Sequence, residues 1–143
     1  MQVSLFGTAL AAADPRAAAD WFVEHLGFGV TVDLGWYVAT QHPQHPSLSL
    51  DFVVDDHASW PVEMRSRPVS GAMLAFLVED VDAEEARLRA AGVESVMDLV
   101  TEPWGQRRFR VAGPDGVVVE VLQRVAPDMD WLAANGLADT AAG

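Results

Sequence analysis

Apolar and polar positions along the first third of the chain predict a strand, a helix and then three strands. Residues 3–10 form a short apolar segment that is typical of a buried strand. A helix is predicted to begin at Asp14-Pro15, because Asp caps free N–H groups and Pro suits the first helical position, and to end at Gly27. Strands are predicted at 28–33, 36–40 and 48–54, and residues 41–46, with two prolines, are predicted to hold no regular structure.

The same order of elements recurs after a polar segment at residues 55–71. A strand is predicted at 72–78, a helix from about Asp82 to Gly92, and another strand at 94–100. Asp82 and Glu85 have the spacing of a capping box, and Glu85 and Arg89 are placed to pair across one helical turn. The tail, residues 126–143, holds one short apolar stretch at 131–137.

The most distinctive stretch is a predicted β-hairpin with strands at 106–112 and 117–122, joined by the turn Gly113-Pro114-Asp115-Gly116. Its return strand places Glu120 among valines. An unpaired carboxylate there would be costly, so we expect either a partner or a raised pKa. The candidate partners are a ligand ammonium group and three arginines of the adjacent strand: Arg107, Arg108 and Arg110.

The second half of the sequence repeats the pattern of the first half at a nearly constant separation. Asp14 and Asp80 each follow a predicted strand, and Gly27 and Gly92 each end a predicted helix, at almost equal separations. The sequence therefore predicts an α+β fold of two tandem β-α-β-β-β modules, with curved mixed sheets around a cleft. The modules are predicted at 1–54 and 72–125, with a linker at 55–71 and a C-terminal tail at 126–143.

Composition narrows the function classes. The 143 residues are 50% apolar, which fits a globular domain, and the net charge of −12 disfavours nucleic acid and anionic membranes as partners. The absence of cysteine excludes disulfides and thiolate chemistry and fits a cytoplasmic location. We find neither a signal-peptide pattern at the N-terminus nor an apolar run long enough to span a membrane.

Three segments carry a resemblance to a known family: ADPRAAADWFVEHLGF, FLVEDVDAEEARLRAAGV and PWGQRRFRVAGPDGVVVEVLQ. They resemble the vicinal oxygen chelate superfamily, which contains glyoxalase I, extradiol dioxygenases, fosfomycin-resistance transferases and bleomycin-resistance proteins. The resemblance covers about residues 3–124 and implies the glyoxalase/bleomycin-resistance fold. It implies much less about activity, because one scaffold hosts unrelated chemistries.

Metal-binding members of that superfamily take ligands from the first and last strands of each module. The first-strand positions correspond here to Gly7 and Met73, neither of which suits a hard divalent ion. The last-strand positions correspond to Glu120, which matches, and to Leu50 or Asp51, where a slip of one residue decides which side chain faces the cleft. The four histidines show no spacing typical of a metalloenzyme. We therefore expect no metal cofactor; the alternative is a divalent ion such as Zn, Ni, Mn or Fe.

The metal-free members that the chain resembles bind small molecules, often aromatic or cationic antibiotics, as dimers. We accordingly expect a homodimer that binds a small aromatic or cationic organic molecule in a metal-free cleft, for drug resistance or sequestration. The candidate ligand-binding residues are Trp36, Asp51, Trp60, Trp104, Phe109 and Glu120, with core packing as the alternative for each of the aromatic residues.

Two alternatives stay open. One is a metal-dependent lyase or dioxygenase of the glyoxalase type with a degenerate metal site, or a metal-free enzyme that uses Glu120 or Asp51 as a general base. Glu120 is the leading catalytic candidate in that case. The other is a fold whose pocket is filled by its own side chains.

Overall fold

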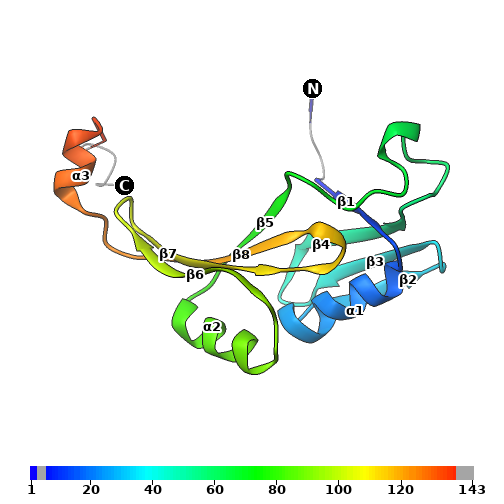
Figure 1. Ribbon diagram of the computed structural model, residues 1–143, viewed down its shortest axis with the longest axis horizontal. Helices are drawn as coiled ribbons and strands as arrows, with labels where there is room; N and C mark the ends of the chain where they lie inside the picture. The colour runs from blue at the N-terminus through cyan, green and yellow to red at the C-terminus, as the bar shows by residue number, and fades with distance from the viewer. Residues whose placement is uncertain (3–5, 138–143) are drawn as a thin grey trace. The chain divides into compact units, whose positions relative to one another are not determined.

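The computed structural model describes residues 1–2 and 6–137 and divides into two compact units (Figure 1). The first unit is formed by Met1–Gly71 with Gly113–Val117, and the second by Ala72–Ala112 with the chain from Val118 onward. Each unit contains one four-stranded mixed sheet, which confirms the predicted α+β fold with two β-α-β-β-β modules. No helix in the described part of the chain has the length and hydropathy needed to cross a membrane.

The first unit has the sheet order β1-β4-β3-β2, in which β1 is parallel to β4 and the other neighbours are antiparallel. Its helix α1 begins after Asp14, whose carboxylate accepts hydrogen bonds from the backbone N–H groups of Arg16 and Ala17, and ends at Gly27 with φ 75°. Both predicted helix ends are confirmed. The elements are β1 (Thr8–Ala12), α1 (Pro15–Leu26), β2 (Gly29–Asp33), β3 (Tyr37–His42) and β4 (His45–Val54).

Two predictions for the first unit need correction. The first strand is Thr8–Ala12, which begins later than the predicted segment 3–10 and ends two residues beyond it; residues 3–5 lie outside the described residues. Residues 41–46 are not a loop: β3 continues to His42 and β4 begins at His45. Pro46 is accommodated because it falls where the β3–β4 register shifts, between the pairs Gln41–Ser49 and His42–His45, so no ladder bond requires its missing N–H.

The second unit has the matching order β5-β8-β7-β6, in which β5 is parallel to β8. The predicted hairpin is confirmed as β7 and β8, and a third helix overlaps the short apolar stretch of the tail. The elements are β5 (Met73–Leu77), α2 (Val81–Ala90), β6 (Ser95–Glu102), β7 (Gln106–Ala112), β8 (Val118–Arg124) and α3 (Met129–Ala134).

The start of α2 differs from the prediction. Asp80 is the N-cap and accepts a hydrogen bond from the Ala83 N–H, so the predicted capping box from Asp82 to Glu85 is wrong. Asp82 lies in the first turn and instead pairs with Arg107 of β7. The predicted ion pair between Glu85 and Arg89 is confirmed.

The turn of the hairpin belongs to the first unit, as does the segment 55–71, which carries a short 3₁₀ helix at Val62–Met64. The N–H of Val69 donates to the Asp115 carbonyl at 2.7 Å. Gly116 has φ +84°, and a Cβ there would lie 2.4 Å from the Val69 carbonyl oxygen. Only glycine permits this approach, which explains why the turn ends in this residue.

Each sheet packs one face against its helix. In the first unit the register puts Val38, Thr40, Leu50 and Phe52 on the face toward α1, where all four are buried. In the second unit Phe109, Val111, Val119 and Val121 form the buried face toward α2. These two apolar layers are the cores of the units, and the remaining face of each sheet carries the polar residues discussed next.

Candidate functional site

The register of β7 and β8 determines the face on which each hairpin side chain lies. Arg110 pairs with Glu120 and Arg108 with Leu122, so these residues share the face opposite α2. We call this the open face, because several large apolar side chains that register places on it are exposed: Met73, Leu77 and Val100. The open face is therefore where a ligand can reach the second sheet.

Glu120 lies at the centre of the open face and is only 6% exposed. Its Oε2 accepts hydrogen bonds from Arg108 Nη1 at 2.8 Å and from Arg110 Nε at 2.7 Å. Arg108 also donates to Glu102 Oε1 through Nε and Nη2, at 3.1 and 2.5 Å. The predicted partner of Glu120 is thus found in Arg108 and Arg110, whereas Arg107 points to the other face and pairs with Asp82.

This charge network decides the ionisation of Glu120. Burial alone raises the pKa of Glu120, but the hydrogen bonds from Arg110 and Arg108, together with their charges, outweigh burial and hold that pKa below its ordinary value. The pKa of Arg108 is raised, chiefly by its hydrogen bond to Glu102. The alternative of a raised pKa for Glu120 is therefore wrong, and a carboxylate of this kind is a poor general base near neutral pH.

Trp104 borders the charge network at the turn between β6 and β7. Its side chain is 41% exposed, and the Arg108 guanidinium carbon lies 5.4 Å from its ring centroid. The indole N–H donates to Gln106 Oε1 at 3.0 Å. An aromatic face, a guanidinium group and a carboxylate are thus continuous in this part of the second unit, which is an arrangement suited to a flat polar ligand.

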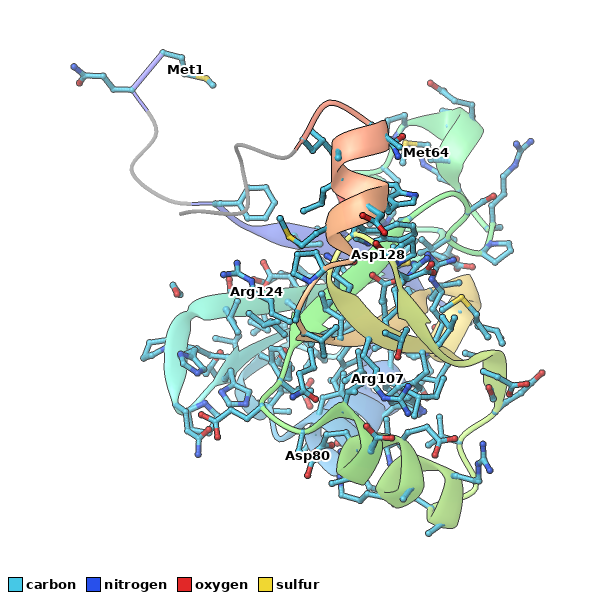
Figure 2. The ribbon with its side chains drawn as sticks, turned by 90° about the vertical axis from the view of Figure 1, so that its left-hand side faces the viewer. Met1, Met64, Asp80, Arg107, Arg124 and Asp128 are labelled. Carbon is cyan, nitrogen blue, oxygen red and sulfur yellow. The ribbon has the colours of Figure 1, made fainter. Side chains whose placement is uncertain are left out.

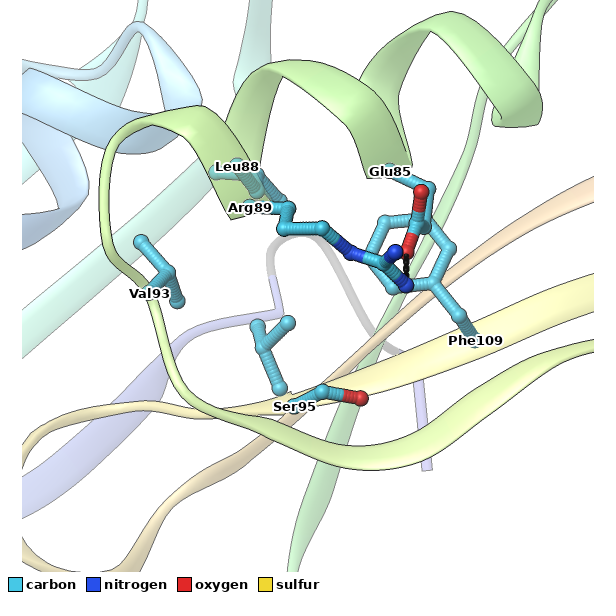
Figure 3. A pocket seen from close by; sticks show the side chains of 7 residues that line it. Glu85, Leu88, Arg89, Val93, Ser95 and Phe109 are labelled. Atoms are coloured by element: carbon cyan, nitrogen blue, oxygen red, sulfur yellow. Dashed lines mark ion pairs between the residues drawn. The ribbon is translucent and has the colours of Figure 1, made fainter.

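Phe109 lies on the opposite face of the sheet from Glu120. It is 2% exposed, pairs with Val121 and belongs to the core beneath α2, which agrees with the core-packing alternative and corrects its placement beside Trp104 and Glu120. The reason is the alternation of a strand: Phe109 stands between Arg108 and Arg110 and must point the other way. A small pocket does reach it from the α2 side (Figure 3), lined by Glu85, Leu88, Arg89, Val93, Ser95, Phe109 and Val111.

In the first unit the carboxylate at the corresponding register position is Asp51. Asp51 pairs with Ala9 and Ala39 and lies on the face opposite α1, whereas Leu50 is buried toward the helix. Burial, and then a hydrogen bond to the Asp51 carboxylate together with its charge, raise the pKa of Tyr37. Asp51 thus lies near the Tyr37 phenol on the same face of the sheet.

Trp36 and Trp60 also belong to the first unit. Trp36 is 44% exposed and stacks on His57, with ring centroids 4.3 Å apart and planes 10° apart. The Trp60 indole N–H donates to the Val54 carbonyl at 3.2 Å and so ties the segment after β4 to the end of that strand. Trp36 keeps an accessible aromatic ring, and Trp60 has a structural bond that accounts for its position.

The donor set does not fit the divalent metal ion that the fold family implies. Gly7 offers no side chain, and Met73 on β5 offers a thioether. Two guanidinium groups already occupy the Glu120 carboxylate, and a divalent ion beside them would be repelled. Across residues 1–2 and 6–137, no three His, Cys, Asp or Glu side chains lie close enough together to hold a metal.

Comparisons with known proteins define the class of this protein. Residues 5–121 match the Glyoxalase/Bleomycin resistance protein/Dioxygenase superfamily, and the chain belongs to that family. No curated protein matches the sequence.

Among solved structures, similarity is found to TnmS3, an antibiotic binding protein from Streptomyces sp. CB03234, at 28% identity and a TM-score of 0.68, over 87% of this chain and 98% of the other. A glyoxalase/bleomycin resistance protein/dioxygenase from Nocardioides superposes with a TM-score of 0.72 at 20% identity, over 87% and 85%. A lactoylglutathione lyase from Agrobacterium tumefaciens gives 0.65 at 21%, over 85% and 94%. The last two similarities support the fold alone.

Sequence reasoning missed Tyr37 as the neighbour of Asp51. Tyr37 pairs with Val53, two residues after Asp51, and Arg108 pairs with Leu122, two residues after Glu120. The two residues are therefore equivalent in the repeat. Aligning the last two strands of the modules with each other was the signal that could have revealed both partners.

Proposed function

We propose that this protein binds a small planar aromatic molecule, without a metal ion, on the open face of the second sheet. The observation that carries the proposal is the double guanidinium pairing of Glu120 beside the half-exposed ring of Trp104. Glu120 stands at the position that supplies a metal ligand in metal-binding members of the family, and here it is part of a charge network. Such a surface offers stacking and hydrogen bonding but no Lewis acid.

The charges of the network favour an acceptor oxygen on the ligand over an ammonium group. Glu102 and Glu120 are both paired with Arg108. The Arg110 side chain is 31% exposed and binds Glu120 through Nε, so its terminal N–H groups are available to a carboxylate or carbonyl oxygen of the ligand. For a cationic ligand, the more suitable carboxylate is Asp51 of the first unit.

A role in drug resistance or sequestration follows from the same proposal. Its support is the 28% identity to TnmS3, which is described as an antibiotic binding protein. A homodimer and a cytoplasmic location remain predictions, which sedimentation of the purified protein and fractionation of the source cells test directly.

The test uses fluorescent probes of opposite charge, 1-pyrenecarboxylate and 1-pyrenemethylammonium, titrated into protein freed of metal with a chelator. We expect saturable binding of the carboxylate, followed by anisotropy, with a dissociation constant on the order of 0.1 mM for a probe of this size. The ammonium probe should bind several-fold more weakly, because the second-unit carboxylates are already paired.

Two variants form a matched pair for this test, since Trp104 and Trp36 are exposed to nearly the same extent. Trp104→Ala should weaken the carboxylate probe by about fivefold, within the range expected for one cation–π or stacking contact. Trp36→Ala should change it by less than twofold. A larger loss in Trp36→Ala, or no saturable binding by the wild type, would overturn the proposal.

The metal-dependent alternative is tested on the same preparation. We expect no stoichiometric uptake of Zn²⁺, Ni²⁺, Mn²⁺ or Fe²⁺ in equilibrium dialysis, because the donor set lacks three suitable ligands. Tight uptake of one equivalent, abolished in Glu120→Gln, would favour the lyase or dioxygenase reading instead.

A further inference from the structure

The helix α3 lies beyond residues 5–121, the part of the chain that matches the family, yet it is joined closely to the second unit. The N–H of Val125 donates to the Gly105 carbonyl at 3.0 Å, and the N–H of Asp128 donates to the Pro103 carbonyl at 2.9 Å. Both acceptors belong to the turn that carries Trp104. Figure 1 shows α3 beyond the β6–β7 end of the sheet. The tail is therefore attached at the edge of the candidate site.

Gly105 permits this attachment. Its φ is +96°, and a Cβ there would lie 2.9 Å from the Val125 carbonyl oxygen and 3.3 Å from Pro127 Cβ. Any other residue would force the tail away from the turn. The glycine therefore serves two purposes, the reversal between β6 and β7 and the close approach of the chain that leads into α3.

Both ends of α3 are capped, and one of its side chains is buried. Asp128, labelled in Figure 2, caps the helix by accepting hydrogen bonds from the N–H groups of Asp130 and Trp131 at 2.9 and 3.1 Å. Leu132 is buried at 5% exposure, and the N–H of Leu137 donates to its carbonyl at 2.8 Å. A helix of only six residues is marginal alone, so these caps and the burial of Leu132 stabilise it.

Trp131 is the side chain that α3 brings to the site. Its ring centroid lies 5.9 Å from that of Trp104, with the planes 53° apart, while the Arg108 guanidinium lies 5.4 Å from the Trp104 ring. Trp131 is partly exposed. Two tilted indoles and one guanidinium thus form a continuous aromatic and cationic surface, which lies at one end of the network that reaches Arg110 through Glu120.

We propose that α3 is a part of the ligand site and that Trp131 is a specificity-determining residue, which selects ligands whose fused aromatic rings extend beyond Trp104. This inference rests on the function proposed above and adds the ligand class: a fused-ring aromatic acid or carbonyl compound, whose rings contact Trp104 and Trp131 and whose oxygen reaches Arg110. A single ring bound at Trp104 gains little from the second indole, whereas a fused system gains additional stacking area.

The experiment compares 1-pyrenecarboxylate with the smaller 2-naphthoate on the full chain. Trp131→Leu keeps an apolar side chain with good helix propensity but removes the aromatic face. It should weaken pyrenecarboxylate by about fivefold and naphthoate by less than twofold. Trp131→Phe should restore most of the affinity for pyrenecarboxylate. Equal losses for the two probes, or a Trp131→Leu variant that binds like the wild type, would overturn the role of α3.

A second variant keeps the inference testable if Trp131→Leu folds poorly. Asp128→Ala removes the cap of α3 without altering an aromatic side chain, and it should weaken pyrenecarboxylate about twofold to threefold while the far-ultraviolet circular dichroism changes little. Unchanged affinity in that variant would contradict the proposed placement of Trp131 by α3. If Trp104→Ala lowers affinity and the α3 variants do not, the proposed function stands and this inference fails.

Discussion

The two units present a carboxylate at the same register position, and they pair it differently. Asp51 lies between Ala9 and Ala39 with the Tyr37 phenol as its neighbour, whereas Glu120 lies between Ala75 and Arg110 with Arg108 at the position equivalent to Tyr37. Two changes in the neighbouring strand, Tyr37 to Arg108 and Ala39 to Arg110, therefore separate a carboxylate beside a neutral phenol from one held by two cations. The comparison shows how a repeated scaffold alters the chemistry of one position through its neighbours on the adjacent strand.

Removing the two carboxylates in turn should give the largest contrast. Glu120→Ala leaves Arg108 and Arg110 without their shared, mostly buried acceptor, and we expect a loss of about 3 kcal/mol in the free energy of unfolding. Asp51→Ala removes a carboxylate that lies near the Tyr37 phenol, for which we expect a loss of about 1 kcal/mol or less. Urea denaturation of both variants checks this order, and equal losses would remove the distinction between the units.

A smaller effect is expected from acid, which should reduce the contribution of Glu120 to the free energy of unfolding. Because the folded-state pKa of Glu120 is lowered, its pairing stabilises the fold above the unfolded-state pKa of about 4.3, and this stabilisation is lost as the pH falls through the folded-state value. The difference in unfolding free energy between wild type and Glu120→Gln should therefore be constant from pH 7 to pH 6 and shrink below about pH 4.5. A difference that grows on acidification would mean that the two arginines do not hold the ionised form.

The smallest expected effect is on the pKa of Tyr37 in the first unit, which absorbance can follow directly. Tyr37 is the single tyrosine of the chain, so tyrosinate absorbance near 295 nm reports on it alone. Its raised pKa should place the midpoint above the ordinary value of about 10, and the stability that this shift contributes is present below that value and lost as the pH rises through the folded-state pKa. Asp51→Asn should move the midpoint toward 10, because it removes the carboxylate charge. An unchanged midpoint would show that Asp51 does not contact the phenol.

The sequence predicted the positions of helices and strands better than the contacts that their residues make. The cap at Asp14, the end at Gly27 and the strand Gln106–Ala112 follow from local chemistry, and the structure agrees with each. Two predictions failed for the same reason, which is that the sequence offers two options that look alike locally. The helix is capped by Asp80 where Asp82 was predicted, and a register shift allows Pro46 into a strand where a loop was predicted.

The amino-acid sequence by itself determined the two β-α-β-β-β repeats, the loss of metal-ligand side chains at Gly7 and Met73, and the presence of a carboxylate in the last strand of the second module. Only the tertiary structure decided that Arg108 and Arg110 both hold Glu120, that Phe109 faces α2, and that α3 brings Trp131 to Trp104. The physical reason is that periodicity specifies which residues of one strand share a face, while the partner across the ladder and the packing of a short tail depend on contacts between segments distant in sequence.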